Sequence, residues 1–267
     1  MLHHADDELI GANITNLQQE TLGNIDALVV DLDSGKVTYA IVSFGGVLGV
    51  GDDLYAVPFN AFSYRPLYDG VVLDVNQAQL EQDEGFPREQ MPDFADRQWG
   101  QTVYQRYGTQ PHWEARSNQG EYGDQHDEWE QDRDQQPRRQ QEAESDERTY
   151  PGMQPQQFVT TYDLIGMTVE NSQGEEVGAV RDLAVDLRSG NVEHVVMGYG
   201  GWLGIGETNT AVPLQMFQPR NLGTDEPVMI IDITQDQLRG APEYPLDEWP
   251  RRGAGSWAEG AGVQSNR

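Results

Sequence analysis

The chain has 267 residues and a formal net charge of −28, from 45 acidic and 17 basic residues. Lys36 is its single lysine, and acid enrichment with so little lysine is typical of adaptation to concentrated salt, where screening suppresses self-repulsion. The charge disfavours binding to nucleic-acid backbones and anionic membranes, which need clustered basic residues, and the absence of cysteine excludes disulfides and thiolate sites.

Nothing at the N-terminus or in the interior predicts insertion into a membrane. The first eight residues, Met1 to Glu8, lack the basic start and the apolar stretch of a secretory signal. No run of 18 apolar residues is present, so no membrane span is expected. We therefore expect a cytoplasmic protein.

Two long strands are expected early in the chain, at residues 22–31 and 37–44, because both runs are rich in β-branched and aromatic residues. Residues 32–36 join them in a turn where Gly35 can take a positive φ. Both runs are apolar on both faces, whereas a strand half-exposed to water would alternate. One face is expected inside a barrel, and the other beneath a strand, a helix or another module.

Shorter elements follow around these strands. A short first strand precedes them, and further strands and one helix come after a glycine-rich connection. About six short strands in some 70 residues, with no long helix, predict a small closed β-barrel or a tight sandwich. The expected ranges are strands at 11–15, 54–58, 62–67 and 71–75 and a helix at 76–82.

The second half of the chain repeats the first. Residues 9–62 align without a gap onto residues 164–217, and 23 of the 54 pairs are identical. After a further shift of three residues, 73–80 aligns with 231–238. The same strands are therefore expected twice. The glycines expected to form turns are Gly35, Gly46, Gly49 and Gly51 in the first copy and Gly190, Gly201, Gly204 and Gly206 in the second.

The composition changes between the two copies. From Gln101 to Gln157 there is no Leu, Ile or Phe, so this stretch cannot bury enough apolar surface to offset its ordering entropy. The predicted organisation is all-β: two small barrels joined by a long disordered linker. The boundaries are module 1 at 6–82, an acidic, Gln-rich linker at 83–159, module 2 at 160–240 and a flexible Pro/Gly-rich tail at 241–267.

One motif string recurs in both copies. It comprises a Leu-Ile-Gly opening, a glycine before a strand, an Asp-Leu-x-Ser-Gly turn, a glycine-rich loop, and Ala-Val-Pro followed by Phe. Over residues 6–82 and 160–240 it resembles the PRC-barrel family. The resemblance implies a structural docking barrel with no shared catalytic residues. Members occur in the H subunit of photosynthetic reaction centres and in maturation factors of the small ribosomal subunit. This chain lacks the membrane helix of the former and the different N-terminal barrel of the latter.

Three motifs suggest chemistry, but each has a simpler interpretation. The glycines of 46–51 lack the Lys-Ser/Thr and the following helix of a phosphate loop, which favours a turn between strands. Residues 31–35 resemble a calcium loop, but Val42 stands where a bidentate Glu is required, and Arg188 replaces Asp33 in the second copy. With 45 acids in the chain, neighbouring carboxylates are expected by chance. We expect no cofactor, no metal site and no catalytic group.

The five histidines do not form an evident catalytic set. His3 and His4 are expected in a frayed terminus, His112 and His126 in the linker. His194 replaces Tyr39 within a strand and is expected to be packed.

The central strands are apolar on both faces, and only one face can point into the barrel. Residues on the other face are the candidates for interaction. The two barrels could cover each other as a pseudo-twofold pair, each could hold a partner, or each could be covered within its own module. Aromatic residues of the linker could dock into a partner or lie back on the barrels. The candidates are Tyr39, Ile41, Phe44, His194, Val196 and Tyr199, and the linker aromatics are Tyr104, Tyr107, Trp113, Tyr122, Trp129 and Tyr150.

The sequence thus predicts a non-enzymatic, salt-adapted tandem-barrel scaffold that docks an unknown protein partner. Two alternatives from the resemblance remain: a factor associated with ribosomes or RNA processing, and an accessory subunit of a complex like a photosynthetic reaction centre.

Overall fold

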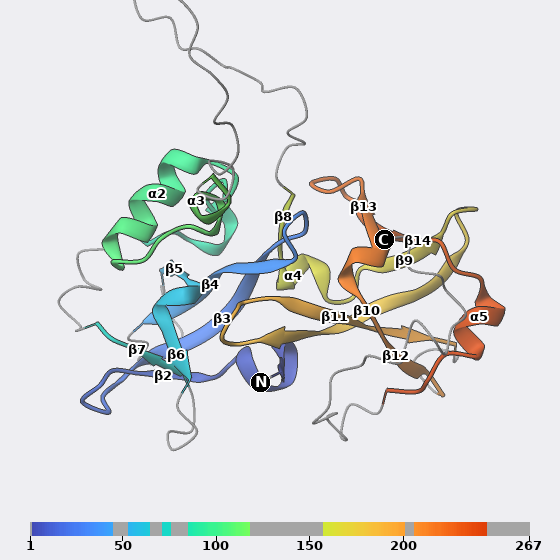
Figure 1. Ribbon diagram of the computed structural model, residues 1–267, viewed down its shortest axis with the longest axis horizontal. Helices are drawn as coiled ribbons and strands as arrows, with labels where there is room; N and C mark the ends of the chain where they lie inside the picture. Colours follow the sequence, from blue (N-terminus) through green and yellow to red (C-terminus); the bar gives the residue numbers. More distant parts are fainter. Residues whose placement is uncertain are drawn as a thin grey trace, which may run out of the picture.

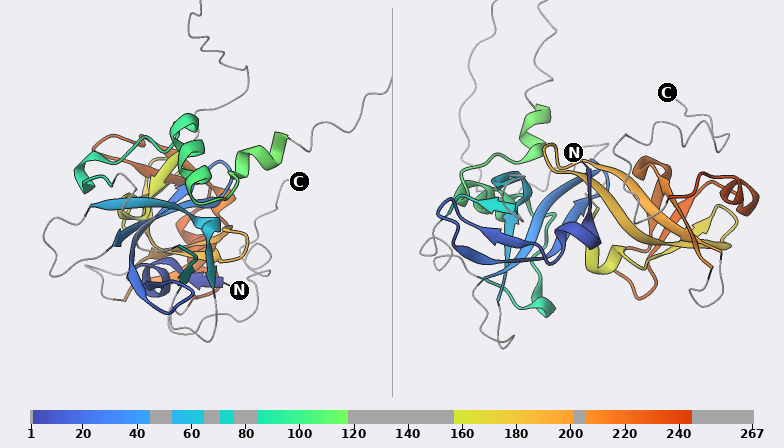
Figure 2. Two further views of the ribbon diagram at one scale, coloured as in Figure 1. Left: turned by 90° about the vertical axis from the view of Figure 1, so that its left-hand side faces the viewer. Right: turned by 90° about the horizontal axis from the view of Figure 1, so that it is seen from below.

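The computed structural model describes residues 2–44, 53–64, 71–75, 85–117, 157–200 and 206–244. Each half of the chain forms one curled β-sheet, and the two sheets lie side by side (Figures 1 and 2). The predicted pair of small β-barrel-like modules is confirmed. No helix within the described ranges is long and apolar enough to cross a membrane.

Module 1 contains six strands of its own in the order β5-β4-β3-β2-β7-β6. All neighbours are antiparallel except β2 and β7, which run parallel. The turn η2 (Phe59–Ala61) leads from β5 into β6. The bounds are β2 (Asn13–Thr15), β3 (Thr21–Asp31), β4 (Lys36–Phe44), β5 (Leu54–Pro58), β6 (Phe62–Tyr64) and β7 (Val71–Leu73).

Module 2 repeats this arrangement in the order β12-β11-β10-β9-β14-β13, again with one parallel pair, β9 and β14. Its final helix, α5, begins with a capping box between Thr234 and Gln237, which satisfies backbone donors at the helix start. The bounds are β9 (Thr168–Asn171), β10 (Glu176–Asp186), β11 (Val192–Tyr199), β12 (Thr208–Val212), η4 (Leu214–Met216), β13 (Phe217–Arg220), β14 (Val228–Ile231) and α5 (Gln235–Arg239).

Each module lends a strand to the other. The N-terminal strand β1 (Leu2–His4) pairs antiparallel with β10 of module 2, and β8 (Phe158–Thr160), which precedes module 2, pairs antiparallel with β3 of module 1. Short helical turns, η1 (Ala5–Leu9) and α4 (Thr161–Leu164), then return the chain to its own module. The exchange is reciprocal, as expected for a pseudo-twofold pair.

The hairpin turns of the modules also meet. The amide of Val37 donates to the carbonyl oxygen of Gly190, and the amide of Val192 donates to that of Gly35, both at 2.8 Å. Lys36 Nζ donates to the carbonyl oxygen of Ser189. Buried apolar side chains from both modules form one continuous core cluster. The two sheets therefore share both hydrogen bonds and apolar contacts.

The expectation of a disordered linker over 83–159 is wrong at its start. Residues 86–114 form η3 (Arg88–Gln90), α2 (Arg97–Arg106) and the beginning of α3 (His112–Ser117), which lie over module 1 (Figure 1). The tail expected from 241 also begins with packed residues, because Ala241 and Tyr244 are buried. Residues 118–156 and 245–267, and the helix predicted at 76–82, lie outside the described residues.

Candidate interaction site

The β-sheet of module 1 has an apolar face that points away from its core. Side chains alternate along a strand, so one set faces the common core and the other set faces outward. The outward set is buried, and it packs with residues from the segment after the module. We call this set the outer face of module 1; it consists of Ala27, Val29, Tyr39, Ile41, Leu54 and Ala56.

Residues 86–113, the covering segment, lie across this face. Tyr39 is fully buried at its centre. The ring centroids of Trp99 and Tyr104 each lie 5.4 Å from that of Tyr39, and the Phe94 centroid lies 5.9 Å from it. Such aromatic pairs stabilise beyond their buried area by about 0.5–1.5 kcal/mol each. The covering segment therefore turns an apolar sheet face into a second core.

Gly100 lets α2 approach the sheet. A Cβ at Gly100 would lie 2.7 Å from Oη of the buried Tyr39 and 3.0 Å from Cη2 of the partly buried Trp113, so the helix or these rings would have to shift. One turn further along, the Tyr104 hydroxyl donates to the carbonyl oxygen of Thr38 at 3.2 Å. Burial raises the pKa of both Tyr39 and Tyr104, so both hydroxyls keep their protons at neutral pH.

The covering segment begins by extending the edge of the sheet. Phe86 and Leu54 exchange two backbone hydrogen bonds, of 2.8 and 2.9 Å, so Phe86 adds one residue of strand beside β5. Arg88 then reaches Asp26, with 3.9 Å between nitrogen and oxygen, and its guanidinium carbon lies 4.3 Å from the ring centroid of Tyr162. The segment is thus joined to module 1 at its first residues.

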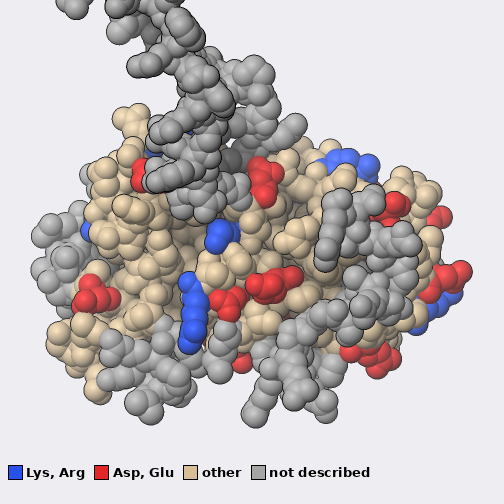
Figure 3. All heavy atoms as spheres, viewed as in Figure 1, with Lys and Arg blue, Asp and Glu red and all other residues tan. Residues whose placement is uncertain are grey.

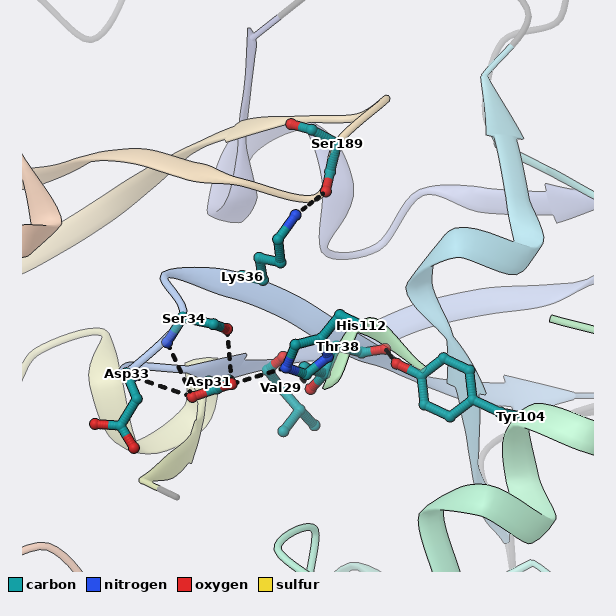
Figure 4. Close-up of polar contacts among 9 residues, drawn as sticks. All are labelled: Val29, Asp31, Asp33, Ser34, Lys36, Thr38, Tyr104, His112 and Ser189. Carbon is teal, nitrogen blue, oxygen red and sulfur yellow. Dashed lines mark hydrogen bonds and ion pairs between the residues drawn. The ribbon is translucent and has the colours of Figure 1, made fainter. Parts of the chain in front are cut away.

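A hydrogen bond between His112 and the buried carboxylate of Asp31 holds the other end of the segment. His112 Nε2 lies 2.9 Å from Asp31 Oδ2, while the Ser34 hydroxyl donates to the same carboxylate at 2.6 Å (Figure 4). Burial by itself raises the pKa of Asp31, but the hydrogen bonds from His112 and Ser34 outweigh it and leave that pKa below its ordinary value. Asp31 therefore connects the β3–β4 turn to α3.

The matching face of module 2 has a different chemistry. We call it the outer face of module 2; at the positions that correspond to the outer face of module 1 it has Asp182, Ala184, His194, Val196, Asn209 and Ala211. His4 Nδ1 of the exchanged strand β1 forms a buried hydrogen bond with Asp182 Oδ2, and Asp182 Oδ1 accepts from the amides of Asp6 and Leu183. Val196 and Ala211 pack with Tyr244.

The predicted interaction residues divide between the two sides of the sheets. Tyr39 and Ile41 lie on the outer face of module 1, and His194 and Val196 on that of module 2. Phe44 and Tyr199 were assigned to the same faces, but both pack against the common core. The reason is the period of two, because position 44 is five residues from position 39 and so points to the opposite side.

The structure also corrects the places expected for three histidines. His3 and His4 are buried in β1 instead of fraying, and His112 packs on module 1. His194 is half-buried within β11, as predicted. The places of His3 and His4 were predicted wrongly because they depend on pairing between β1 and β10. The sequence does not show that the edge of β10, far along the chain, accepts another strand.

The sequence analysis missed the helix α2 and the packing of Phe94, Trp99 and Val103, and it placed Tyr104 and Tyr107 in a disordered linker. The sequence pattern that could have revealed this helix begins with an N-cap residue, Asp96, whose side chain accepts from the amides of Gln98 and Trp99. Apolar side chains then follow at helical spacing, at Trp99, Val103, Tyr104 and Tyr107. Tyr104, Tyr107 and Trp113 thus lie back on the chain's own module, whereas Tyr122, Trp129 and Tyr150 lie outside the described residues.

Three of the eight glycines predicted to form turns lie in the described part of the chain. Gly35, Gly190 and Gly206 have φ of +68°, +71° and +78°. Gly46, Gly49, Gly51, Gly201 and Gly204 lie outside the described residues. Among the residues that the structure does describe, no group of three potential metal ligands comes together.

Comparison with known proteins defines the family. The model of the PRC-barrel domain matches residues 1–80 and 157–238, which is more than half of the chain and covers both modules. The protein therefore belongs to the PRC-barrel family, with two tandem PRC-barrel domains. A search of curated proteins found no match.

Proposed function

We propose that this protein is a non-enzymatic scaffold that docks an aromatic peptide segment of a partner protein on the outer face of module 1. The observation that carries this proposal is the covering segment, which occupies that face as a bound peptide would. It adds backbone hydrogen bonds to the edge strand β5 and places aromatic side chains on the sheet. These are the two components of peptide recognition by strand addition.

The exposed surface supports docking by exchange. Among the described residues, Leu17 is the one large apolar side chain that is exposed. Partner sites on proteins are usually contiguous apolar patches. In the described part of the chain, such a patch would form on module 1 when the covering segment leaves it. The chain's own segment would then compete with the partner and set the affinity.

The titratable pairs support a non-enzymatic role. His4 and Asp182, and His112 and Asp31, join separate segments to the sheets and are largely shielded from solvent. A general base or nucleophile must instead reach a substrate. We therefore assign these pairs to the stability of the fold. The cytoplasmic location expected from the sequence stays a prediction.

The charge distribution favours a protein partner over RNA. Four arginines in the described ranges pair with acids: Arg88 with Asp26, Arg181 with Glu207, Arg220 with Glu170 and Arg239 with Asp236. On the face shown in Figure 3, basic side chains are separate spots and not a continuous patch. Binding to a phosphate backbone requires such a patch.

The test uses a full-length variant that opens the covering segment. Gly100→Leu should displace α2, because the added side chain would overlap Tyr39 and Trp113. Gln101→Leu, at an exposed position of the same helix, is the matched control. A synthetic peptide of residues 86–113 should bind to Gly100→Leu at least tenfold more tightly than to the wild type or the control. Titration calorimetry measures this directly.

The same variants test for a partner. Proteins captured by Gly100→Leu should be released by the synthetic peptide and should cross-link to β4 or β5. Hydrogen exchange must show that the sheet stays protected while α2 opens; if the sheet is lost, Trp99→Ala with Tyr104→Ala provides a milder opening. Failure of the peptide to bind an opened, folded chain would refute the proposal. So would captured proteins that the peptide does not displace.

A further inference from the structure

Residues from both modules hold one cation of the covering segment. Arg88 Nη2 lies 3.9 Å from Oδ1 of Asp26 in β3, and the Arg88 guanidinium carbon lies 4.3 Å from the ring centroid of Tyr162 in α4. Asp26 belongs to module 1, whereas Tyr162 comes from the turn that leads into module 2 and packs on the outer face of module 1. We call Asp26 and Tyr162 the guanidinium subsite; it is complete only when α4 lies on module 1.

The chemistry of this subsite suits arginine better than lysine. A planar guanidinium can lie over an aromatic ring and meet a carboxylate at the same time, whereas an ammonium is a compact, strongly hydrated charge. Burial and the charge of Asp26 raise the pKa of Tyr162 against the opposing effect of Arg88, so the ring stays neutral beside the cation. The Asp26 side chain is 31% exposed, so a ligand from outside the chain can reach its carboxylate.

Arg88 fills the guanidinium subsite incompletely. Its distance of 3.9 Å from Asp26 is longer than a hydrogen bond, and its own side chain is 52% exposed. Ion pairs exposed to this degree contribute little to stability. A peptide that brings its guanidinium within hydrogen-bond distance of Asp26 would therefore bind there more strongly than Arg88 does.

The corresponding position of module 2 has the opposite charge. Asp26 in β3 and Arg181 in β10 are each the extra residue of a β-bulge, which changes the direction of a side chain. Arg181 already donates to Glu207 at 2.5 and 2.9 Å. The turn η1 of module 1, which lies on module 2, has aspartates where α4 has Tyr162. An arginine therefore distinguishes the outer face of module 1 from that of module 2.

We propose that the guanidinium subsite selects the partner of module 1: the docked peptide carries an arginine two residues after the residue that pairs with Leu54, followed by aromatic side chains for the sheet. This is the spacing of Arg88 after Phe86 in the covering segment. The net charge of −28 favours the approach of such a basic segment. The inference rests on the docking proposed above and adds the chemistry of the docked peptide.

Two peptides of residues 86–113, wild-type and Arg88→Gln, test the subsite on the full-length chain opened by Gly100→Leu. Titration calorimetry should show that Arg88→Gln binds about three- to tenfold more weakly, the effect of one exposed cation–π contact together with an ion pair. Equal binding of the two peptides would overturn this inference and leave the docking proposal in place. Binding of neither peptide would refute the docking proposal and this inference with it.

Variants of the opened chain show whether the difference arises at this subsite. Adding Asp26→Asn with Tyr162→Leu should abolish the difference between the two peptides. Adding Asp33→Asn, which removes an exposed acid from the β3–β4 turn, is the matched control and should preserve it. A difference that survives the loss of Asp26 and Tyr162 would place the arginine elsewhere and contradict the proposal.

A charge reversal provides a second measurement that does not depend on lost packing. Asp26→Arg introduces the residue type that the same bulge has in module 2, so the strand can accommodate it. The opened chain with Asp26→Arg should bind an Arg88→Glu peptide more tightly than the wild-type peptide, and the opened chain without it should show the reverse order. If the wild-type peptide remains the stronger ligand of both chains, Asp26 does not select the partner's charge and the proposal is wrong.

Discussion

Gly35 and Gly190 close equivalent turns in the two modules, and both have the left-handed backbone that favours glycine. Their surroundings differ. A Cβ at Gly190 would lie 3.2 Å from the carbonyl oxygen of Val37 and 3.4 Å from the ring of Phe59. At Gly35 the nearest atoms belong to side chains at ordinary distances, 3.6 Å and 3.7 Å away. The turn at Gly190 is thus confined by the backbone of module 1, whereas the turn at Gly35 meets only side chains of module 2.

We therefore expect Gly35→Ala to destabilise the protein by about 1–2 kcal/mol, the typical cost of a left-handed conformation for an L-residue. Gly190→Ala should cost more, because the strained residue also meets Val37 and Phe59. Urea unfolding measures both. Asn tolerates this conformation better, so Gly35→Asn should recover part of the loss. Equal losses for the two Ala variants would show that the contact between the turns is looser than described.

His194 gives stability a dependence on pH. Burial lowers its pKa, and the nearby Glu193 offsets only part of this effect. In the unfolded chain the pKa returns to about 6.5, so the unfolded state binds more protons as the pH falls through that value. The contribution of His194 to stability should therefore be lost from about pH 6.5 downward. Unfolding free energies between pH 7.5 and 5.5 should fall less steeply for His194→Gln than for the wild type. His126→Gln is the control, and parallel curves would contradict the assignment.

At the level of elements, the exchange of β1 and β8 defines how the modules are joined. The long strand β3 pairs with β2 over its first half and with β8 over its second half, on the same edge. Beyond β8, the hydroxyl of the buried Thr161 accepts from the amide of Leu28 at 3.0 Å. A side chain of module 2 thus continues the hydrogen bonding of module 1.

Thr161→Val tests this junction. It removes the acceptor and leaves the buried amide of Leu28 unpaired, which typically costs about 1–3 kcal/mol. Hydrogen exchange at Leu28 should accelerate with the loss of stability, and Thr161→Ser should restore both. Thr102→Val, at an exposed position of α2, should change neither. Slow exchange at Leu28 in Thr161→Val would mean that another group satisfies this amide.

Much of each sheet could be predicted from the sequence, because long runs rich in β-branched residues, such as 37–44, lie between turn residues and have a counterpart in the second copy. The exchanged strands could not. β1 and β8 have three residues each, too few to show a period, and β1 pairs with residues 180–184 positions away. The helix of the covering segment was missed because its composition is polar on average. That its aromatic side chains lie back on a barrel was one of two alternatives, and only the face that they cover decides between them.

For the whole molecule, the shared core predicts cooperative unfolding. Neither sheet is complete without a strand from the other half, so the loss of one module exposes edges and apolar surface of the other. We expect one calorimetric transition. Leu183→Ala in module 2 removes a fully buried side chain and should cost about 2–5 kcal/mol. It should lower the same transition that Thr161→Val lowers. Two transitions, each responding to its own module, would show that the barrels are independent.

The net charge of −28 should make this unit depend on salt. Like charges on a compact surface repel, and the Debye length shrinks from about 10 Å at 0.1 M to about 3 Å at 1 M. Exposed ion pairs such as Arg239 with Asp236 lose strength in salt, but such pairs contribute only about 0–1 kcal/mol each. The relief of repulsion should therefore outweigh the weakening of these ion pairs. Each kcal/mol added to the free energy of unfolding raises the melting temperature by about 2–4 °C for a protein of this size.

The melting temperature should therefore rise between 0.1 and 2 M KCl, and the cause can be separated from general salting-out. A variant with three exposed acids neutralised, Asp33→Asn, Asp225→Asn and Glu226→Gln, has less charge to screen. If repulsion is the cause, this variant starts at a higher melting temperature in low salt and gains less from KCl, so the two curves converge. If KCl raises the melting temperatures of both proteins equally, salt acts by strengthening the burial of apolar surface. A wild-type melting temperature that stays flat over the range would remove the argument for salt adaptation.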